Sequence, residues 1–169
     1  MTQYVFHPDD AIRYRFPTHT NDLITDRADG AASEAFFVVL EPGETVPIHQ
    51  HVGVEQVWFV LEGEGDARFG PDAAESHPIR PGDYVRTPPE TFHSTRCVGD
   101  RRLVYLSIDC FVAGPPPDEP TWDSHVDVMC ATNGWDRDSV RHGRVEGDAR
   151  AIPGRPASIP AAARPATSE

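Results

Sequence analysis

Gly43-Glu-Thr-Val-Pro-Ile-His-Gln-His51 is the stretch of this chain that decides its fold. Side chains two apart on a β-strand point to the same side, so His49 and His51 can bind one ion if the segment is extended, whereas on a helix they would splay apart. A third histidine, His93, follows later in the chain, after a Pro-Gly-Asp turn. Together the three histidines predict a metal site on a β framework.

Short runs of β-forming residues, separated by turn residues, extend on both sides of this stretch from Glu34 to Val112. Such spacing is typical of an all-β sandwich or barrel, and no part of the range has a convincing helical period. The turns contain the Pro and Gly residues that tight turns require. We expect strands at residues 35–40, 46–51, 56–61, 65–69, 83–87, 92–97 and 103–110.

The length of 169 residues leaves room for one domain with a substantial core. We expect an N-terminal extension at 1–33 with strands that contact a second subunit, and the barrel at 34–112. An irregular segment at 113–148 would pack on the barrel or on the partner, with a short helix around 136–142. The residues 149–169 are mostly Ala, Pro, Ser and Arg, which predicts an extended or mobile tail.

Composition narrows the function. The formal net charge of -12 argues against nucleic acid or an anionic membrane as partner. The chain has no lysine, which excludes Schiff-base and lysine-nucleophile chemistry. No long apolar run and no signal-type start is seen, and the three cysteines lack the spacing of a disulfide framework or a zinc ribbon. These features predict a cytoplasmic protein.

Two segments of the chain resemble the two conserved motifs of the cupin superfamily. The first is read at Gly43, His49, His51, Gln56 and Gly63, and the second at Gly82, Pro88, Glu90, His93 and Cys97. The resemblance implies a small single-domain cupin, an all-β double-stranded β-helix (jelly roll) with irregular N- and C-terminal extensions and one divalent metal ion in its mouth. Similar proteins commonly pair through N-terminal strands, so we expect a homodimer.

The resemblance also implies the ligands, which are His49, His51, His93 and a fourth residue. The family usually has Glu where this chain has Gln56, and it has Gly and Asn in place of Glu90 and Cys97. Glu55 is an alternative to Gln56, but turning Glu55 inward would send the neighbouring residues of the strand to the opposite face. Such a site suits Fe(II), Zn(II), Ni(II), Co(II) or Mn(II). A neutral Gln leaves the ion its full charge, which favours an anionic substrate.

Other residues have both a functional and an ordinary interpretation. Trp58 and Phe92 flank the expected ligands and would line a substrate pocket, or simply pack in the core. Arg68 and Arg86 would bind a substrate carboxylate if they point inward, and otherwise are solvated. Tyr105 and Asp109 lie on one polar face of a strand and, with Glu90, are candidates for proton transfer. The histidines outside the motifs are expected at the surface: His7, His19, His77, His125 and His142.

The function expected from this site is that of a metal-dependent enzyme acting on a small polar or anionic molecule. An Fe(II) oxygenase is the first choice, because a His-rich site with open positions can hold substrate and dioxygen side by side. Similar cupins are isomerases, epimerases, lyases or decarboxylases that use the ion as a Lewis acid. A non-catalytic module that binds a small ligand is the third interpretation.

Overall fold

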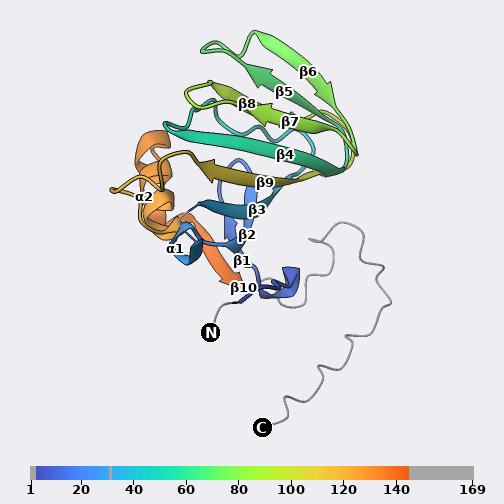
Figure 1. The fold of residues 1–169 in the computed structure, drawn as a ribbon. Helices are drawn as coiled ribbons and strands as arrows, with labels where there is room; N and C mark the ends of the chain where they lie inside the picture. The colour runs from blue at the N-terminus through green and yellow to red at the C-terminus, as the bar shows by residue number, and fades with distance from the viewer. Residues whose placement is uncertain (1–2, 31, 145–169) are drawn as a thin grey trace.

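The computed structural model describes residues 3–30 and 32–144, and these residues form two antiparallel sheets (Figure 1). The large sheet has the strand order β10-β1-β2-β3-β9-β4-β7, and the small sheet has the order β6-β5-β8. The bounds of the strands are β1 Ile12–Arg15, β2 Thr20–Thr25, β3 Ser33–Leu40, β4 Val54–Glu62, β5 Gly65–Phe69, β6 Glu75–Ile79, β7 Tyr84–Thr87, β8 His93–Cys97, β9 Leu103–Phe111 and β10 Arg141–Arg144. The all-β class predicted from the sequence is confirmed.

Six of the seven expected strands are present, each with ends within two residues of the expected ones, as β3, β4, β5, β7, β8 and β9. The segment expected as a strand at 46–51 makes only the isolated bridge of His49 with His93, and Thr45 just before it makes another with Arg96. The strand β6 was not predicted, because Pro78 lowers its strand signal; β6 tolerates this proline because it lies at the edge of the small sheet. The strand β2 was not predicted either.

Helices are few, and the longest is α2, Trp122–Asn133. The others are the short elements η1 Pro8–Asp10, α1 Arg27–Gly30 and η2 Arg137–Ser139. The short helix expected around 136–142 is present as the single-turn helix η2, followed by β10, whereas the longer helix α2 was not predicted. The boundaries of α2 have a local cause: Thr121 and Ser124 form a capping box, and Gly134 ends the helix with a φ of 66°.

The N-terminal strands pair within their own chain. The strand β1 pairs with both β2 and β10, and β2 pairs with β3, so the sheet edge on this side is β10. The strands β1 and β2 are therefore interior strands of the chain's own sheet, and their expected contact with a second subunit remains a prediction. The expected tail at 149–169 lies outside the described residues.

The inward face of the large sheet arranges polar and apolar side chains in rows. Pairing of β3, β9 and β4 places Glu34 opposite Asp109 and Asp109 opposite Gln56. The next inward row contains apolar and aromatic side chains, with Phe36 and Trp58 on either side of a serine. The period of two along each strand produces this layering. It places a buried polar row next to an aromatic one.

His19 is buried in this core, where the sequence predicted a surface residue. It is 3% exposed, stacks on Phe16 with a centroid separation of 4.9 Å, and its Nδ1 is 2.9 Å from the hydroxyl of Thr18. Burial lowers the pKa of His19 to about 3, with smaller contributions from His49 and Arg15. The ring is therefore neutral at physiological pH.

Replacing His19 by glutamine should make the metal-free protein less sensitive to acid. A histidine whose folded-state pKa is lowered contributes stability above its unfolded pKa, near 6.5, and that stability is lost as the pH falls toward the folded value. Between pH 7 and pH 5, the wild type should lose about 2 kcal/mol more free energy of unfolding than His19→Gln. Urea unfolding at both pH values measures the difference, and equal losses in the two proteins would contradict it.

Candidate metal centre

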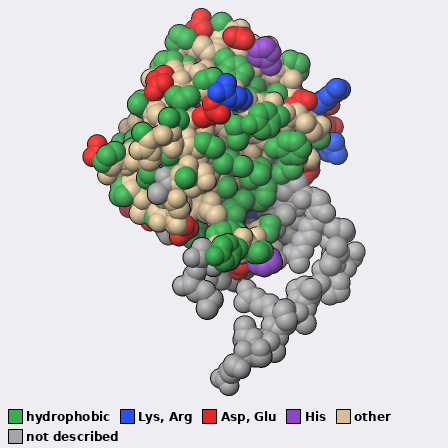
Figure 2. Space-filling view, in the orientation of Figure 1, with side chains coloured by type: hydrophobic (Ala, Val, Ile, Leu, Met, Phe, Trp, Pro, Cys, Tyr) green, Lys and Arg blue, Asp and Glu red, His purple; other side chains and the backbone are tan. Residues whose placement is uncertain are grey.

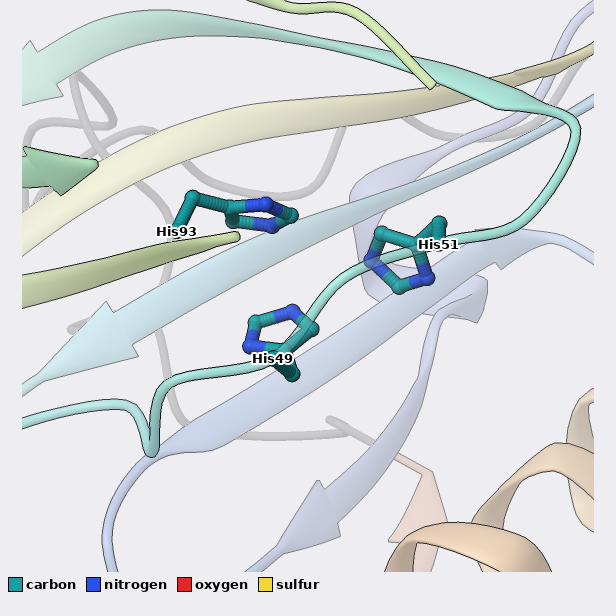
Figure 3. A group of neighbouring side chains, drawn as sticks. All are labelled: His49, His51 and His93. Atoms are coloured by element: carbon teal, nitrogen blue, oxygen red, sulfur yellow. The ribbon is translucent and has the colours of Figure 1, made fainter. Parts of the chain in front are cut away.

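Three imidazoles converge at one point of the barrel (Figure 3). His49 and His93 occupy opposite positions of an antiparallel bridge, in which each backbone N–H donates to the other's carbonyl, at 3.0 and 2.8 Å. His51 follows two residues after His49 on the same extended segment. The ring centroids are 4.3 to 5.4 Å apart, and one possible ligand nitrogen from each ring lies within 4.8 Å of the others.

Hydrogen bonds prepare two of these rings for metal binding. The Nδ1 of His49 is 2.8 Å from the carbonyl of Pro47, and the Nδ1 of His93 is 2.8 Å from that of Thr91. A carbonyl only accepts, so each Nδ1 carries the proton and each Nε2 keeps its lone pair. The Nε2 of His93 is buried and has no hydrogen-bond partner in the described part of the chain. An ion would satisfy it, so the three histidines fit a divalent metal.

Burial keeps the three imidazoles neutral, which is the state that binds metal. It lowers the pKa of His93 to about 3 and also lowers the pKa values of His49 and His51. Neighbouring imidazoles act in the same direction on His93 and His51. No proton has to be displaced from these rings before an ion binds at neutral pH.

Gln56 lies on the inward face of β4 beside the histidines and is 5% exposed. Its Oε1 accepts from the indole N–H of Trp58 at 2.6 Å, and its Nε2 donates to Asp109 Oδ1 at 2.6 Å and lies 3.3 Å from His51 Nε2. Because an indole N–H only donates, this bond determines which way the amide points. Gln56 as the fourth ligand remains a prediction that requires the amide to turn over.

Several other predicted site residues lie away from the three imidazoles. Glu55 points to the opposite face of β4, where its carboxylate pairs with Arg86, which is largely exposed. Arg68 pairs with Asp66 at the surface of β5, 3.0 Å away. Phe92 is half-buried just before β8 and does not line the cavity described below. The alternation of their strands sends Glu55, Arg68 and Arg86 outward. The structure therefore gives no support to the proposed roles of these residues or of Phe92.

Glu90 supports a loop rather than facing the imidazoles. Its Oε1 accepts from the N–H of Gly53 at 3.0 Å, and its own N–H donates to the carbonyl of His51 at 2.9 Å. Its φ of 58° lies in the left-handed region, which explains why glycine is the usual residue here in cupins. Glu90 therefore holds the ends of two loops together next to a predicted ligand.

Tyr105 and Asp109 point inward from β9 and both line the cavity. The hydroxyl of Tyr105 donates to the hydroxyl of Thr95 at 3.3 Å, and burial raises its pKa. Burial also raises the pKa of Asp109 to about 6. Asp109 reaches the histidines through Gln56, whereas Tyr105 packs against Trp58 with a centroid separation of 5.2 Å.

Sequence reasoning missed a buried charge cluster behind Asp109. Arg27 forms a two-point ion pair with Glu34, with distances of 2.8 and 2.6 Å, and its Nη1 is 3.2 Å from the carboxylate of Glu119. Burial raises the pKa of Glu34 to about 7, and the adjacent carboxylate of Asp109 acts in the same direction. The cluster joins α1, β3, β9 and the loop before α2. A charge pattern in sequence could not show it, because Asp109 and Glu119 are far from Arg27 and Glu34 along the chain and the burial of the cluster depends on packing.

His125 of α2 was also missed, since it was expected at the surface. Its Nδ1 lies 2.5 Å from the carboxylate of Glu119, and its ring centroid is 6.2 Å from that of His51. Its side chain is 14% exposed and lines the cavity. The capping residues of α2 are the sequence signal that could have placed His125 on a helix, but not next to the barrel.

A cavity of about 600 Å³ opens beside His49 and His51, between the barrel and α2. His49 and His51 line one part of it. The residues of α2 and of the Pro115–Pro117 loop line another part. A ligand of any metal bound to the histidines therefore has a chamber to occupy.

Residues 36–109 match the family model of the cupin domain, so the chain contains a cupin domain. An oxalate-binding protein of Thermotoga maritima is 32% identical over 69 residues, which are 41% of this chain and 54% of that protein, so the match spans about half of the relative's length.

Solved structures show the same fold. A predicted oxalate decarboxylase from Thermotoga maritima aligns with a TM-score of 0.58 and 20% identity, over 64% of this chain and 99% of that one. A protein of Klebsiella pneumoniae with a double-stranded β-helix domain aligns with a TM-score of 0.57 and 17% identity, over 67% of this chain and 94% of that one. The predicted jelly roll is confirmed. Among the described helices, none has the length and apolar character needed to cross a membrane.

Proposed function

We propose that this protein is a metal-dependent cupin enzyme that holds one divalent ion through His49, His51 and His93 and acts on a small anionic molecule. The observation that carries the proposal is the buried, unpartnered Nε2 of His93 within a group of neutral imidazoles. A bound ion would supply a positively charged centre with open coordination positions. The reaction class that we favour is oxygenation with Fe(II), because a site of this donor type leaves room for a second ligand beside the substrate.

The chain's own residues would position the substrate. The indole ring of Trp58 packs beside the ring of His93, with centroids 5.6 Å apart, and so limits the space for a substrate on that side of the ion site. Gln56 is fixed between Trp58 and Asp109, so its amide N–H faces the ion site. Asp109, with a pKa raised to about 6, is the buried carboxyl group nearest to that amide and the best candidate to hold a proton.

Metal exchange tests the proposed function. Protein stripped with chelator and reloaded with Fe(II), Zn(II), Ni(II), Co(II) or Mn(II) should bind one ion per chain. Oxygen uptake only with Fe(II), together with a colour change under nitric oxide, would support the oxygenase. Turnover with Zn(II) and without oxygen would instead support an isomerase, lyase or decarboxylase that uses the ion as a Lewis acid. Failure of all five ions to bind would overturn the proposal.

A second candidate is a binding module without turnover. The Thermotoga maritima relative is an oxalate-binding protein by name, which favours binding without turnover. The structural neighbour is a predicted oxalate decarboxylase by name, which favours decarboxylation instead. Thermal stabilisation by oxalate of the metal-loaded protein, with no product formed, would support binding alone. Carbon dioxide release from oxalate would support the decarboxylase.

Gln56→Glu should weaken the binding of carboxylate ligands to the metal-loaded protein. The neutral amide leaves the charge of the ion undiminished, whereas a carboxylate at this position would reduce it. The variant would also place a second carboxylate against Asp109, which now accepts from Gln56 at 2.6 Å. Acetate titrated into the Zn(II) form of both proteins measures the effect. Equal or tighter binding by the variant would show that the charge argument is wrong.

The homodimer expected from the sequence remains a proposal, and an outward apolar row supports it. On the outer face of the large sheet, Phe59 and Tyr84 are opposite each other and are 44% and 64% exposed. Hydrophobic side chains gather on one face of the molecule (Figure 2). Large exposed apolar groups of this kind are typical of contact surfaces. Light scattering coupled to gel filtration would measure the mass in solution.

A further inference from the structure

The cavity beside the metal centre is much larger than a small dicarboxylate needs. Its volume is about 600 Å³, in the middle of the range of about 300–1,000 Å³ that is usual for pockets holding drug-sized ligands. Oxalate, the ligand named for the relative in Thermotoga maritima, is one of the smallest dianions and would leave most of this space to water. The size of the cavity therefore indicates a ligand with a substantial body beyond its metal-binding group.

The wall opposite the barrel comes from the C-terminal segment outside the cupin match, and its apolar part consists of Trp122, Val128, Met129 and Trp135. Trp122 of α2 lies on Phe36 of β3, with centroids 4.6 Å apart. Met129 and Trp135 line the same cavity and are half-buried. Phe36 and Trp122 pack directly on each other and close one side of the cavity, and Met129 and Trp135 extend this apolar lining along the open space, which suits the body of an apolar ligand.

This wall is anchored to the barrel. The backbone N–H of Trp122 donates to Asp26 Oδ1 at 2.9 Å, and Tyr14 donates to Asp123 at 3.3 Å. Glu119, just before the helix, accepts from the buried Arg27. Because α2 is held by partners from the N-terminal part of the chain, the chamber exists before a ligand enters, and no ordering cost reduces the affinity.

Polar groups occupy the end of the chamber at the metal centre. His49, His51 and His125 line the cavity, as do Gln56 and Asp109 of the buried polar row. The ring of His125 lies between the two regions, 6.2 Å from His51 and 5.4 Å from Trp122 by centroids. The chamber is thus polar where an ion would bind, and beyond His125 its lining includes the apolar side chains of Trp122, Met129 and Trp135.

We propose that the natural ligand is an organic anion with an aromatic or other ring-bearing apolar body, whose anionic group meets the metal ion and whose body lies between the barrel and α2. This inference rests on the proposed function for its anionic end. The apolar end rests on the cavity and on Phe36, Trp122, Met129 and Trp135 alone. In this arrangement α2 determines which anion is accepted, and the histidines determine how it is anchored.

Calorimetric titration of acetate, oxalate, benzoate and 2-naphthoate into the Zn(II)-loaded full chain tests the proposal. Each additional methylene-sized group that is buried should tighten binding about fourfold. We expect 2-naphthoate to bind more than tenfold more tightly than benzoate, and benzoate more tightly than acetate or oxalate. Equal affinities across the series, or the tightest binding by oxalate, would overturn the inference.

Variants of α2 locate the apolar end of the site. Met129→Gln should remove most of the increase in affinity from benzoate to 2-naphthoate and leave the affinity for acetate unchanged. Thr132→Trp, at an exposed position of the same helix that borders the cavity, should exclude 2-naphthoate by filling the space. The control is Val98→Asn, a similar loss of apolar surface at an exposed site outside the cavity, 54% exposed. Unchanged 2-naphthoate affinity in both α2 variants would place the ring elsewhere and refute the proposal.

The two proposals fail in different ways. If the protein does not take up Zn(II), the proposed function fails, and the stoichiometry measured before each titration shows this. If Zn(II) is bound but larger anions gain nothing, only the inferred ligand class is wrong. If chelator-treated protein binds 2-naphthoate as tightly as the Zn(II) form, the ion does not anchor the anion, which also overturns the proposal.

Discussion

His93→Ala is expected to abolish stoichiometric binding of a divalent ion. His93 is 1% exposed, its Nδ1 is held by the carbonyl of Thr91, and its free Nε2 faces His49 and His51. Changes to the outer partners of a metal ligand already cost about 10–100-fold in affinity, so loss of the ligand itself should cost more than about 100-fold. Metal analysis after gel filtration of protein reloaded with Zn(II) measures the ions per chain.

The design of this experiment separates metal binding from folding. His77→Ala is the control, because His77 is an exposed histidine on β6 that pairs with Glu75. His93→Leu keeps most of the buried volume and offers no ligand atom, so it should fold if the alanine variant does not, and it should also lose the ion. One ion per chain in either folded His93 variant would remove His93 from the ligands.

Arg27→Met should produce a large loss of stability at a site outside the metal centre. The side chain of Arg27 is 2% exposed and its partner Glu34 is fully buried, so the variant leaves a buried carboxylate without its counter-charge. Breaking a buried pair from one side costs about 3–5 kcal/mol. In a chain of this size that corresponds to a fall in Tm of about 6–20 °C. Urea and thermal unfolding measure both quantities.

The pH dependence of the same variant provides a second test. The folded-state pKa of Glu34 is raised above its unfolded value, so protonation stabilises the folded state, and this contribution is lost as the pH rises through about 7. Without Arg27 the carboxyl should hold its proton more tightly, and the variant should be less destabilised at pH 6 than at pH 8. A loss independent of pH would contradict this account.

Two further variants control for the loss of charge and of volume. Arg27→Met combined with Glu34→Leu removes both charges and should recover much of the loss, since no unpaired group stays buried. Arg86→Met breaks the exposed pair with Glu55 and should change the unfolding midpoint little. If Arg86→Met lowered the free energy of unfolding as much as Arg27→Met, burial of the ion pair would not explain the loss of stability.

The cupin domain and the C-terminal segment divide the site between them. The domain provides the three histidines, which the family model covers together with β3, β4 and β9. The helix α2 and the loop before it lie beyond the matched residues 36–109 and form the aromatic wall of the cavity. Our proposal follows this division: the domain anchors an anion, and the added segment selects it.

The sequence by itself determined the fold class and the three histidines. Both depend on local rules, namely the period of two along a strand and the spacing of motif residues, and these rules hold before the chain folds. The same parity argument correctly placed Gln56 inward and Glu55 outward, because a one-residue shift would have turned the whole apolar face of β4 to solvent.

Only the tertiary structure decided what surrounds those histidines. The orientation of the Gln56 amide depends on Trp58 and Asp109, and the position of His125 depends on where α2 packs. The charge cluster brings Glu119 and Asp109 to the pair of Arg27 and Glu34, and so joins residues from separate parts of the chain. Contacts of this kind arise from the packing of distant segments, and no local pattern records them. The shape of the cavity, and hence the class of ligand, is therefore a property of the folded chain.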